Sequence, residues 1–266
     1  MSKNVILRPG VDMTQKIVAV VNQKGGVGKT TTAINVAAQL AGGSTPVLLV
    51  DLDPQGNATS GLGVAKSQAA ATTYETLGGR VPLAQAVHET HVAQLHVLPA
   101  NANLAGAEVE LVARPRREFA LSEVLSAATS YKYVIIDCPP SLGLLTVNGL
   151  TAADSVLIPV QAEYYALEGL SQLLDTIQAV RSSVNPRLQL LGIVLTMFDK
   201  RNSLSEQVLG EVKNYFGDSL FDSIIPRNVR LAEAPSYGRT IYEHDRWSKG
   251  ARSYKALAKE VRTRLG

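Results

Sequence analysis

The sequence has only one cysteine, Cys138, and few large aromatic residues. A single thiol cannot form an intramolecular disulfide, and it leaves no cysteine pair for a zinc knuckle or an iron–sulfur cluster. With four phenylalanines and one tryptophan, any core must be filled mainly by Val, Ile, Leu and Ala. Hydrophobic residues make up 45% of the chain, which is enough for a sizeable core of that kind.

Long apolar runs and low-complexity stretches are also missing. No uninterrupted apolar run approaches the ~20 residues that cross a bilayer. The first sixteen residues carry four charged side chains and no apolar block, so a signal peptide is not expected. No Pro/Gly/Ser-rich linker divides the chain, and no solenoid repeat recurs. We therefore expect a cytoplasmic protein without membrane association, with a flexible N-terminal extension over 1–16 and a single domain over 17–266.

The charge is unevenly distributed along the chain. Residues 1–180 contain 11 Lys/Arg and 14 Asp/Glu, whereas residues 181–266 contain 15 and 9, which gives net charges of −3 and +6. A basic C-terminal third is compatible with a nucleic-acid footprint. It is also compatible with solvated helix faces that carry Arg and Lys, so charge alone leaves both interpretations open.

Short runs of β-branched and aliphatic residues are typical of strands buried on both faces. The runs are 17–21, 47–50, 95–98, 133–136, 155–160 and 190–196. Segments of helical period alternate with them, including 31–40, 142–152 and 167–180. The alternation predicts an α/β fold, a doubly wound and mostly parallel sheet with helices on both faces. Ligands of such folds bind at the carboxyl ends of the strands, so the chemistry should follow the apolar runs.

A glycine-rich loop follows the first predicted strand. Its residues are Lys24, Gly25, Gly26, Val27, Gly28, Lys29, Thr30 and Thr31. The glycines leave backbone N–H groups free to surround phosphate oxygens, and the following helix directs its positive end at them. Lys29 is placed to reach the β- and γ-phosphates, and the Thr30 hydroxyl to bind Mg²⁺. The strict P-loop pattern has a glycine where this chain has Gln23, and a second lysine, Lys24, opens the loop.

The sequence Lys-Gly-Gly-Val-Gly-Lys-Thr-Thr resembles the deviant Walker A motif of the ParA/MinD superfamily, and the chain as a whole resembles its ParA/Soj chromosome- and plasmid-partitioning ATPases. The resemblance implies a P-loop NTPase fold with ATP and Mg²⁺ as cofactors. It also implies an ATP-dependent sandwich homodimer, in which Lys24 reaches the phosphates of the partner subunit and is catalytic together with Lys29. A cation supplied in trans stabilises charge that develops during phosphoryl transfer, as an arginine finger does. Gly25 would lie at the subunit junction, where a side chain would obstruct close approach.

Aspartates end two more of the predicted strands. Asp51 and Asp53 follow the second strand of the chain, and Asp137 follows the run 133–136. Carboxylates at this edge suit the organisation of Mg²⁺ and water near a γ-phosphate, although aspartate also caps many helices. Asp137 completes a Walker B pattern and should bind Mg²⁺ through water. By resemblance, Asp53 positions the attacking water, and Asp51 holds the metal environment or the loop. Cys138, next in sequence, is expected to be a buried apolar residue.

Two later segments resemble the family as well. Residues 159–169 are similar to a ParA-specific stretch and are interpreted as a nucleotide-responsive loop that lines the dimer, although an ordinary loop and helix start is an open alternative. Residues 224–230 correspond to the corner that contacts adenine in the family, which assigns Pro226 and Asn228 to the base. Bases are commonly selected by a few hydrogen bonds in an otherwise apolar slot.

The basic C-terminal third supplies the candidates for a DNA surface. By resemblance, Arg201 and Arg230 lead, and Arg227, Lys249 and Arg252 accompany them. No aromatic ladder is apparent among them, so stacking on single strands is not expected. The first strand begins too early to leave room for a preceding helix-turn-helix, in contrast to the longer plasmid ParA proteins. We therefore expect binding to double-stranded DNA that is independent of sequence and strongly dependent on salt.

The resemblance implies a DNA-segregation cycle. ATP drives formation of a dimer that binds nucleoid DNA non-specifically, and a ParB-like centromere-binding partner stimulates slow hydrolysis and releases it. The alternative is a MinD-like membrane-associated positioning ATPase, which would use an amphipathic C-terminal helix. The tail has apolar residues at helical spacing: Tyr254, Leu257, Val261 and Leu265. This face is narrow and lacks Phe and Trp, so we expect it to pack on its own domain.

Overall fold

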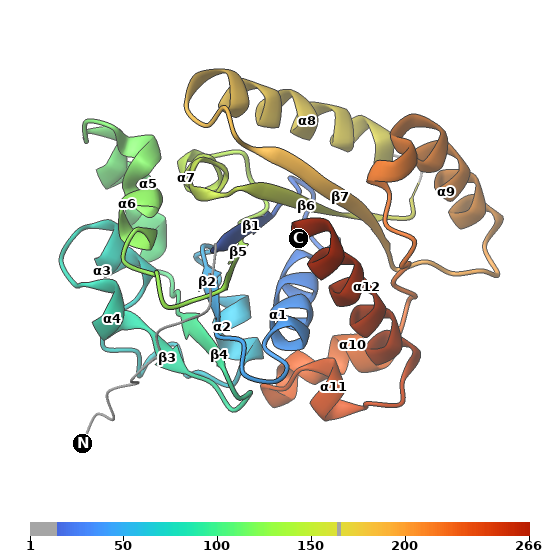
Figure 1. The fold of residues 1–266 in the computed structure, drawn as a ribbon, viewed down its shortest axis with the longest axis horizontal. Coiled ribbons are helices and arrows are strands. Elements are labelled where there is room, and N and C mark those ends of the chain that lie inside the picture. Colours follow the sequence, from blue (N-terminus) through green and yellow to red (C-terminus); the bar gives the residue numbers. More distant parts are fainter. Residues whose placement is uncertain (1–14, 164–165) are drawn as a thin grey trace.

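The computed structural model describes residues 15–163 and 166–266. Most of the predicted N-terminal extension therefore lies outside the described residues, as do Tyr164 and Tyr165 of the predicted dimer-lining loop. The described chain forms one seven-stranded sheet with helices on both sides (Figure 1).

The strand order of the sheet is β3-β4-β2-β5-β1-β6-β7, and every neighbouring pair is parallel except β3 and β4. The strands are β1 Lys16–Val20, β2 Val47–Asp51, β3 His88–Glu89, β4 Leu95–Leu98, β5 Tyr133–Asp137, β6 Ser155–Gln161 and β7 Gln189–Thr196. The predicted doubly wound, mostly parallel architecture is confirmed. Each predicted strand is present, with ends that differ by no more than about one residue, as is usual for strand boundaries. The edge strand β3 was not predicted, because two residues carry no periodic signal.

Twelve α-helices lie in the described residues. They are α1 Lys29–Leu40, α2 Asn57–Gly61, α3 Thr73–Leu77, α4 Leu83–Ala86, α5 Leu104–Val112, α6 Ala120–Leu125, α7 Leu144–Ala152, α8 Ala166–Ser183, α9 Ser203–Phe216, α10 Val229–Glu233, α11 Ile241–His244 and α12 Lys249–Leu265. The three predicted helices correspond to α1, α7 and α8. Helix α7 begins two residues later than predicted, because Gly143 has an extended backbone and serves as its N-cap.

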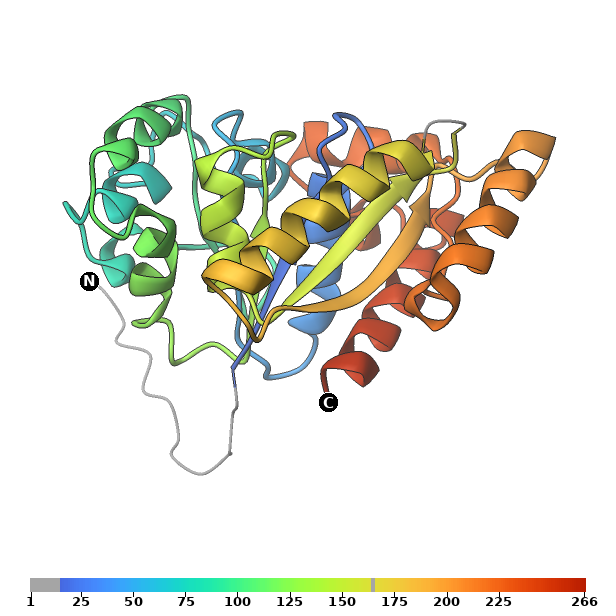
Figure 2. The same ribbon diagram turned by 90° about the horizontal axis from the view of Figure 1, so that it is seen from above.

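The sheet separates two apolar layers. All residues of β2 and β5 are buried, as expected for central strands covered on both faces. Leu48 and Val50 of β2 face the layer that includes α6, α7 and α8, whereas Val47 and Leu49 face the layer that includes α1 and α12. Figures 1 and 2 show these helix groups on opposite sides of the sheet. The alternation of strand side chains thus fills both layers at once.

The C-terminal helix α12 packs against α1 (Figure 1). Its apolar face is buried, with exposures of 7% or less, at Tyr254, Leu257, Val261 and Leu265. The Tyr254 hydroxyl also lies 3.1 Å from the hydroxyl of Thr32 on α1. The expectation that this face packs on its own domain is confirmed. Across 15–163 and 166–266, the structure contains no helix with the length and apolar character that a membrane span requires.

Candidate functional site

The glycine-rich loop connects β1 to α1 (Figure 2). Gly26 and Gly28 have φ angles of 76° and 87°, a left-handed conformation that residues with a side chain rarely adopt. The Thr196 hydroxyl, at the end of β7, donates a 2.8 Å hydrogen bond to the Val27 carbonyl oxygen. The backbone conformation and this bond together hold the loop around the start of α1, whose first residue is Lys29.

The two lysines of the loop have different surroundings. Lys29 is 6% exposed, and its Nζ donates to the Lys24 carbonyl oxygen at 2.9 Å. Burial lowers the pKa of Lys29, while the nearby charges of Asp137 and Asp53 raise it. Lys24 is about half-exposed, and its Nζ lies 2.7 Å from a carboxylate oxygen of Glu163. The buried ammonium therefore faces the loop, and the exposed one faces the segment that follows β6.

Asp51 and Asp137 are neighbours because they are register partners at the ends of β2 and β5. The Asp51 carboxylate accepts hydrogen bonds from the Thr59 N–H at 2.8 Å, from the Thr59 hydroxyl at 2.6 Å and from the Asp53 N–H at 3.2 Å. Burial raises the pKa of Asp51 to about 6, and these hydrogen bonds oppose the shift. The contacts of Asp51 thus hold the loop that leads into α2.

Asp137 has a buried carboxylate, and neither oxygen has a hydrogen-bond partner among the described residues. Burial raises its pKa, as does the charge of Asp51, whereas the nearby Thr30 hydroxyl lowers it. An unpartnered buried carboxylate beside a hydroxyl supplies hard oxygen ligands of the kind that Mg²⁺ binds, directly or through water. This donor set therefore fits Mg²⁺. Elsewhere in the described residues no cluster of His, Cys, Asp and Glu forms a separate metal site.

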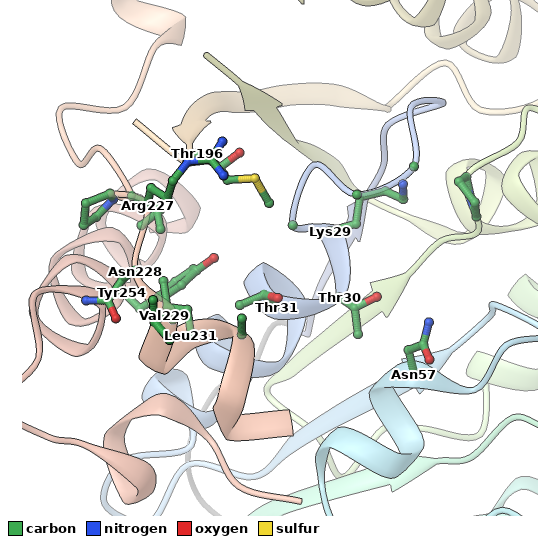
Figure 3. A pocket seen from close by; sticks show the side chains of 18 of the residues that line it. Lys29, Thr30, Thr31, Asn57, Thr196, Arg227, Asn228, Val229, Leu231 and Tyr254 are labelled. Carbon is green, nitrogen blue, oxygen red and sulfur yellow. The ribbon is translucent and has the colours of Figure 1, made fainter. Parts of the chain in front are cut away.

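A cavity of about 590 Å³ lies in front of the glycine-rich loop (Figure 3). Lys29, Thr30 and Asp53 line it together with Pro226 and Asn228. The structure thus brings the predicted phosphate, water and base residues to one place, although they are far apart in the sequence. Among the other predicted residues, Gly25, Gly26, Gly28 and Thr31 also line the cavity, whereas Lys24, Val27, Asp51 and Asp137 do not.

Much of the cavity wall could not be identified from the sequence. Figure 3 shows Val229, Leu231 and Tyr254 across the cavity from Lys29 and Thr30. The further lining residues are Gln55, Asn57, Pro140, Thr196, Met197, Ile225, Arg227 and Ala232. Of these, Arg227 was predicted as a DNA contact, and Ile225 lies in the segment 224–230 that was predicted to contact adenine. They come from elements that only the fold brings together. A largely apolar wall with a few polar groups is typical of a slot for a nucleobase.

Comparison with known proteins identifies the family. A family model described as an AAA domain matches residues 15–190. The chain is 51% identical to the chromosome partitioning protein ParA of Caulobacter vibrioides, over 94% of each chain. It is 54% identical to the chromosome-partitioning ATPase Soj of Thermus thermophilus, over 93% of this chain and 96% of that one. The chain belongs to the ParA/Soj family of chromosome-partitioning ATPases.

A solved structure agrees with this ParA/Soj assignment in fold. The Mycobacterium smegmatis protein described as cobyrinic acid a,c-diamide synthase, solved with ADP and magnesium, is 40% identical. The match covers 92% of this chain and 93% of that one, with a TM-score of 0.81.

In the present chain the sole cysteine, Cys138, is 1% exposed, and burial raises the pKa of its thiol. Cys138 is therefore the buried apolar residue that was expected, without the thiolate character of a reactive cysteine.

The predicted DNA residues of this ParA/Soj-family chain are all exposed. Arg201 pairs with Asp199 at 2.8 Å, and Arg230 pairs with Glu233 at 2.9 Å. Hydrogen bonds from Arg201 hold the pKa of Asp199 down at about 2, with a smaller contribution from the charge of Arg227. Arg201 and Arg227 therefore lie close to the same carboxylate, although 26 positions separate their numbers in the sequence.

The other two candidates are Lys249 and Arg252, in the first turn of α12. Neither has an ion-pair partner within the described ranges. Arg230 lies near the start of α12 as well, because its Nε is 3.8 Å from the carboxylate of Asp245, just before that helix.

Proposed function

We propose that this protein is a DNA-segregation ATPase whose cavity binds ATP with Mg²⁺. The observation that supports this most directly is the cavity, which joins Lys29 and Thr30 to the apolar wall around Asn228. Such a cavity offers cationic and backbone groups to the phosphates at one end and an apolar slot to the base at the other. The Mycobacterium relative, solved with ADP and magnesium, supports the same cofactors.

The phosphate end is assigned to the loop and to two oxygen donors. Lys29 contacts the β- and γ-phosphates once its Nζ leaves the Lys24 carbonyl, 2.9 Å away. Thr30 and Asp137 would hold Mg²⁺. The Asp137 carboxylate, at the carboxyl end of β5, has no hydrogen-bond partner among the described residues, so its oxygens are available as metal ligands. Asp51 supports the site through its bonds to Thr59. When bound, Mg²⁺ neutralises charge that develops on the transferring phosphoryl group.

The base end is assigned to Pro226 and Asn228. The Asn228 side-chain oxygen accepts the N–H of Arg230 at 2.9 Å and thereby caps α10. This bond fixes the orientation of the amide, and its NH₂ group is the half that contacts adenine.

Dimerisation brings Lys24 to the phosphates of the partner subunit. Its ion pair with Glu163 involves two side chains that are 47% and 44% exposed. Pairs of this exposure contribute at most about 1 kcal/mol, so release of Lys24 from Glu163 is not a barrier to this role. Gly25 supports a close subunit junction at this loop. A Cβ added to Gly25 would have no atom of its own subunit within 4 Å. The fold of the monomer therefore does not require glycine at this position, whereas a close subunit junction would.

Hydrolysis depends on Asp53 and on a partner protein. Asp53 lines the cavity and is 7% exposed, and its Oδ1 accepts the Gln55 N–H at 2.9 Å, which orients the carboxylate. We assign Asp53 to positioning the attacking water. Turnover is slow without stimulation, and a ParB-like centromere-binding protein accelerates it and returns the ATPase to a monomer.

The exposed basic residues form the DNA surface of the dimer. Arg201, Arg227, Arg230, Lys249 and Arg252 contact backbone phosphates, so binding is non-specific and places the protein on the nucleoid. The carboxylate partners of Arg201 and Arg230 are themselves exposed enough to be exchanged for phosphate at little cost.

The membrane alternative is not favoured by the C-terminal helix. An amphipathic anchor must offer its apolar face to lipid. The corresponding face of α12 is already covered by α1, with Leu257 and Val261 fully buried.

Binding of the purified protein to non-specific double-stranded DNA tests the proposal. We expect binding with ATP, none with ADP or without nucleotide, and a steep loss of affinity with salt. Arg201→Glu should dimerise with ATP, and the slope of log K against log salt should fall by about one or more. Arg187→Glu is the charge-matched control, at an exposed position just before β7 and thus at the opposite edge of the sheet, and it should leave the slope unchanged. Absence of DNA binding with every nucleotide would reject the DNA surface and make liposome binding the next measurement.

A further inference from the structure

An aromatic patch lies just before α12 and consists of Tyr242, Arg246 and Trp247. Trp247 is the only tryptophan of the chain and is 77% exposed. The Arg246 guanidinium lies 4.9 Å from the centroid of the Trp247 ring and 5.5 Å from that of Tyr242. Tryptophan is usually among the more buried residues of a domain, so an exposed indole held beside an arginine points to a contact surface.

The patch has a fixed position at the edge of the basic surface. The backbone N–H of Trp247 donates to the Asp245 carboxylate at 3.1 Å, and the same carboxylate lies 3.8 Å from Arg230. On the other side, Ser248 caps α12 by accepting the Ala251 N–H at 3.1 Å. The backbone of Trp247 is therefore fixed between Arg230 and the first turn of α12, where two further DNA candidates lie.

The charge around the patch favours a polyanion. Residues 226–255 contain seven Lys/Arg and three Asp/Glu. All three acidic side chains are engaged within the protein. Glu233 bonds to Arg230, Asp245 bonds to Trp247, and Glu243 bonds to the backbone and hydroxyl of Thr240. The charge that faces outward is thus predominantly positive, and it includes Arg246.

We propose that the aromatic patch is a second contact to duplex DNA, in which the Trp247 indole supplies an apolar part beside the charge of Arg246. The Trp247 indole packs against sugars and base edges in the minor groove, and Arg246 lies along the same groove. An apolar contact of this kind tolerates any sequence, because every nucleotide offers the same sugar surface in the minor groove. The inference rests on the proposed DNA-binding function. The contact adds a part of the binding free energy that does not depend on salt concentration.

The emission of Trp247 reports on the patch directly, because the chain contains no other tryptophan. The full-length protein is titrated with non-specific duplex DNA in the presence of ATP, and the emission of Trp247 is recorded together with anisotropy of a labelled duplex. We expect the emission to be quenched in parallel with the anisotropy change, and neither to change with ADP. A change in emission with ATP alone would assign the patch to the subunit junction and overturn the proposal.

Two variants separate an apolar contact from a phosphate contact. Trp247→Ala should weaken DNA binding about fivefold, because the apolar surface of the indole that is buried against the groove returns to water, and it should leave the slope of log K against log salt unchanged. Lys249→Ala should reduce that slope by about one. Tyr215→Ala removes an aromatic side chain that is also 77% exposed, near the far end of α9, and should leave binding unchanged.

The outcomes distinguish this inference from the function on which it rests. Wild-type protein that fails to bind DNA with ATP would overturn both. Wild-type protein that binds DNA, with unchanged Trp247 emission and unchanged affinity of Trp247→Ala, would overturn the aromatic contact alone. Quenching by an acidic protein such as polyglutamate to the same extent as by DNA would show that only charge is recognised, and would overturn it too.

Discussion

Replacing Leu257 with alanine tests the packing of α12 on α1. Leu257 is 0% exposed and lies within the apolar layer that includes α1. The substitution removes the equivalent of three methylene groups, which amounts to about 2.4 kcal/mol of transfer free energy at ~0.8 kcal/mol each. The cavity left behind adds to this, so we expect the free energy of unfolding to fall by about 3–4 kcal/mol.

Urea unfolding followed by far-ultraviolet circular dichroism measures this loss, with an unchanged m-value as the sign that only stability has changed. Lys255→Ala, at an exposed position two residues earlier on the same helix, is the matched control and should change stability by less than about 0.5 kcal/mol. A loss below about 1 kcal/mol for Leu257→Ala would refute the buried packing and return support to the membrane alternative.

Three further predictions concern the nucleotide. Lys29→Ala should weaken ATP binding at least about tenfold, because a charge-assisted hydrogen bond to phosphate is lost, and unchanged affinity by calorimetry would contradict the assignment. Lys24→Ala should retain ATP binding but lose about 10³-fold in partner-stimulated turnover, so wild-type stimulation would exclude its role in trans. Gly25→Val should fold and bind ATP as a monomer, since a Cβ at this position meets no atom of its own subunit within 4 Å. A dimer mass for this variant in light scattering with ATP would show that the junction lies elsewhere.

The fold was predictable wherever an element is long enough to show a continuous apolar run or a helical period. The apolar runs that became β2 and β5 are buried along their whole length, so hydrophobicity alone marks them. Asp51 and Asp137 were placed after these runs and are in fact their last residues, because the ladder continues until the carboxylates. The short elements around β3 and α10 have too few residues for a period and depend on tertiary contacts.

The site was predictable where its residues are contiguous. The loop from Lys24 to Thr31 is a single motif, and its chemistry follows from residue types and spacing. The apolar wall is different, because Leu231 and Tyr254 belong to separate helices and only the periodicity of Tyr254 was visible. Trp247 shows the same limit, since a lone tryptophan in a sequence gives no sign of whether it is buried or exposed.

The bond from Thr196 to the glycine-rich loop has a mechanical consequence. Thr196 touches the loop at Val27, and five residues later the chain reaches Arg201 on the outer surface. Between them, the backbone of Phe198 is joined to Ile225 at 3.1 Å and to Arg227 at 3.0 Å, in the segment that borders the base. A chain of five residues spans at most about 17 Å, so this hydrogen-bonded segment keeps Arg201, a proposed DNA contact, within that distance of Thr196. One hydrogen bond and five residues of backbone thus join the glycine-rich loop to Arg201, a route that would couple the conformation of the loop to the position of the proposed DNA contact.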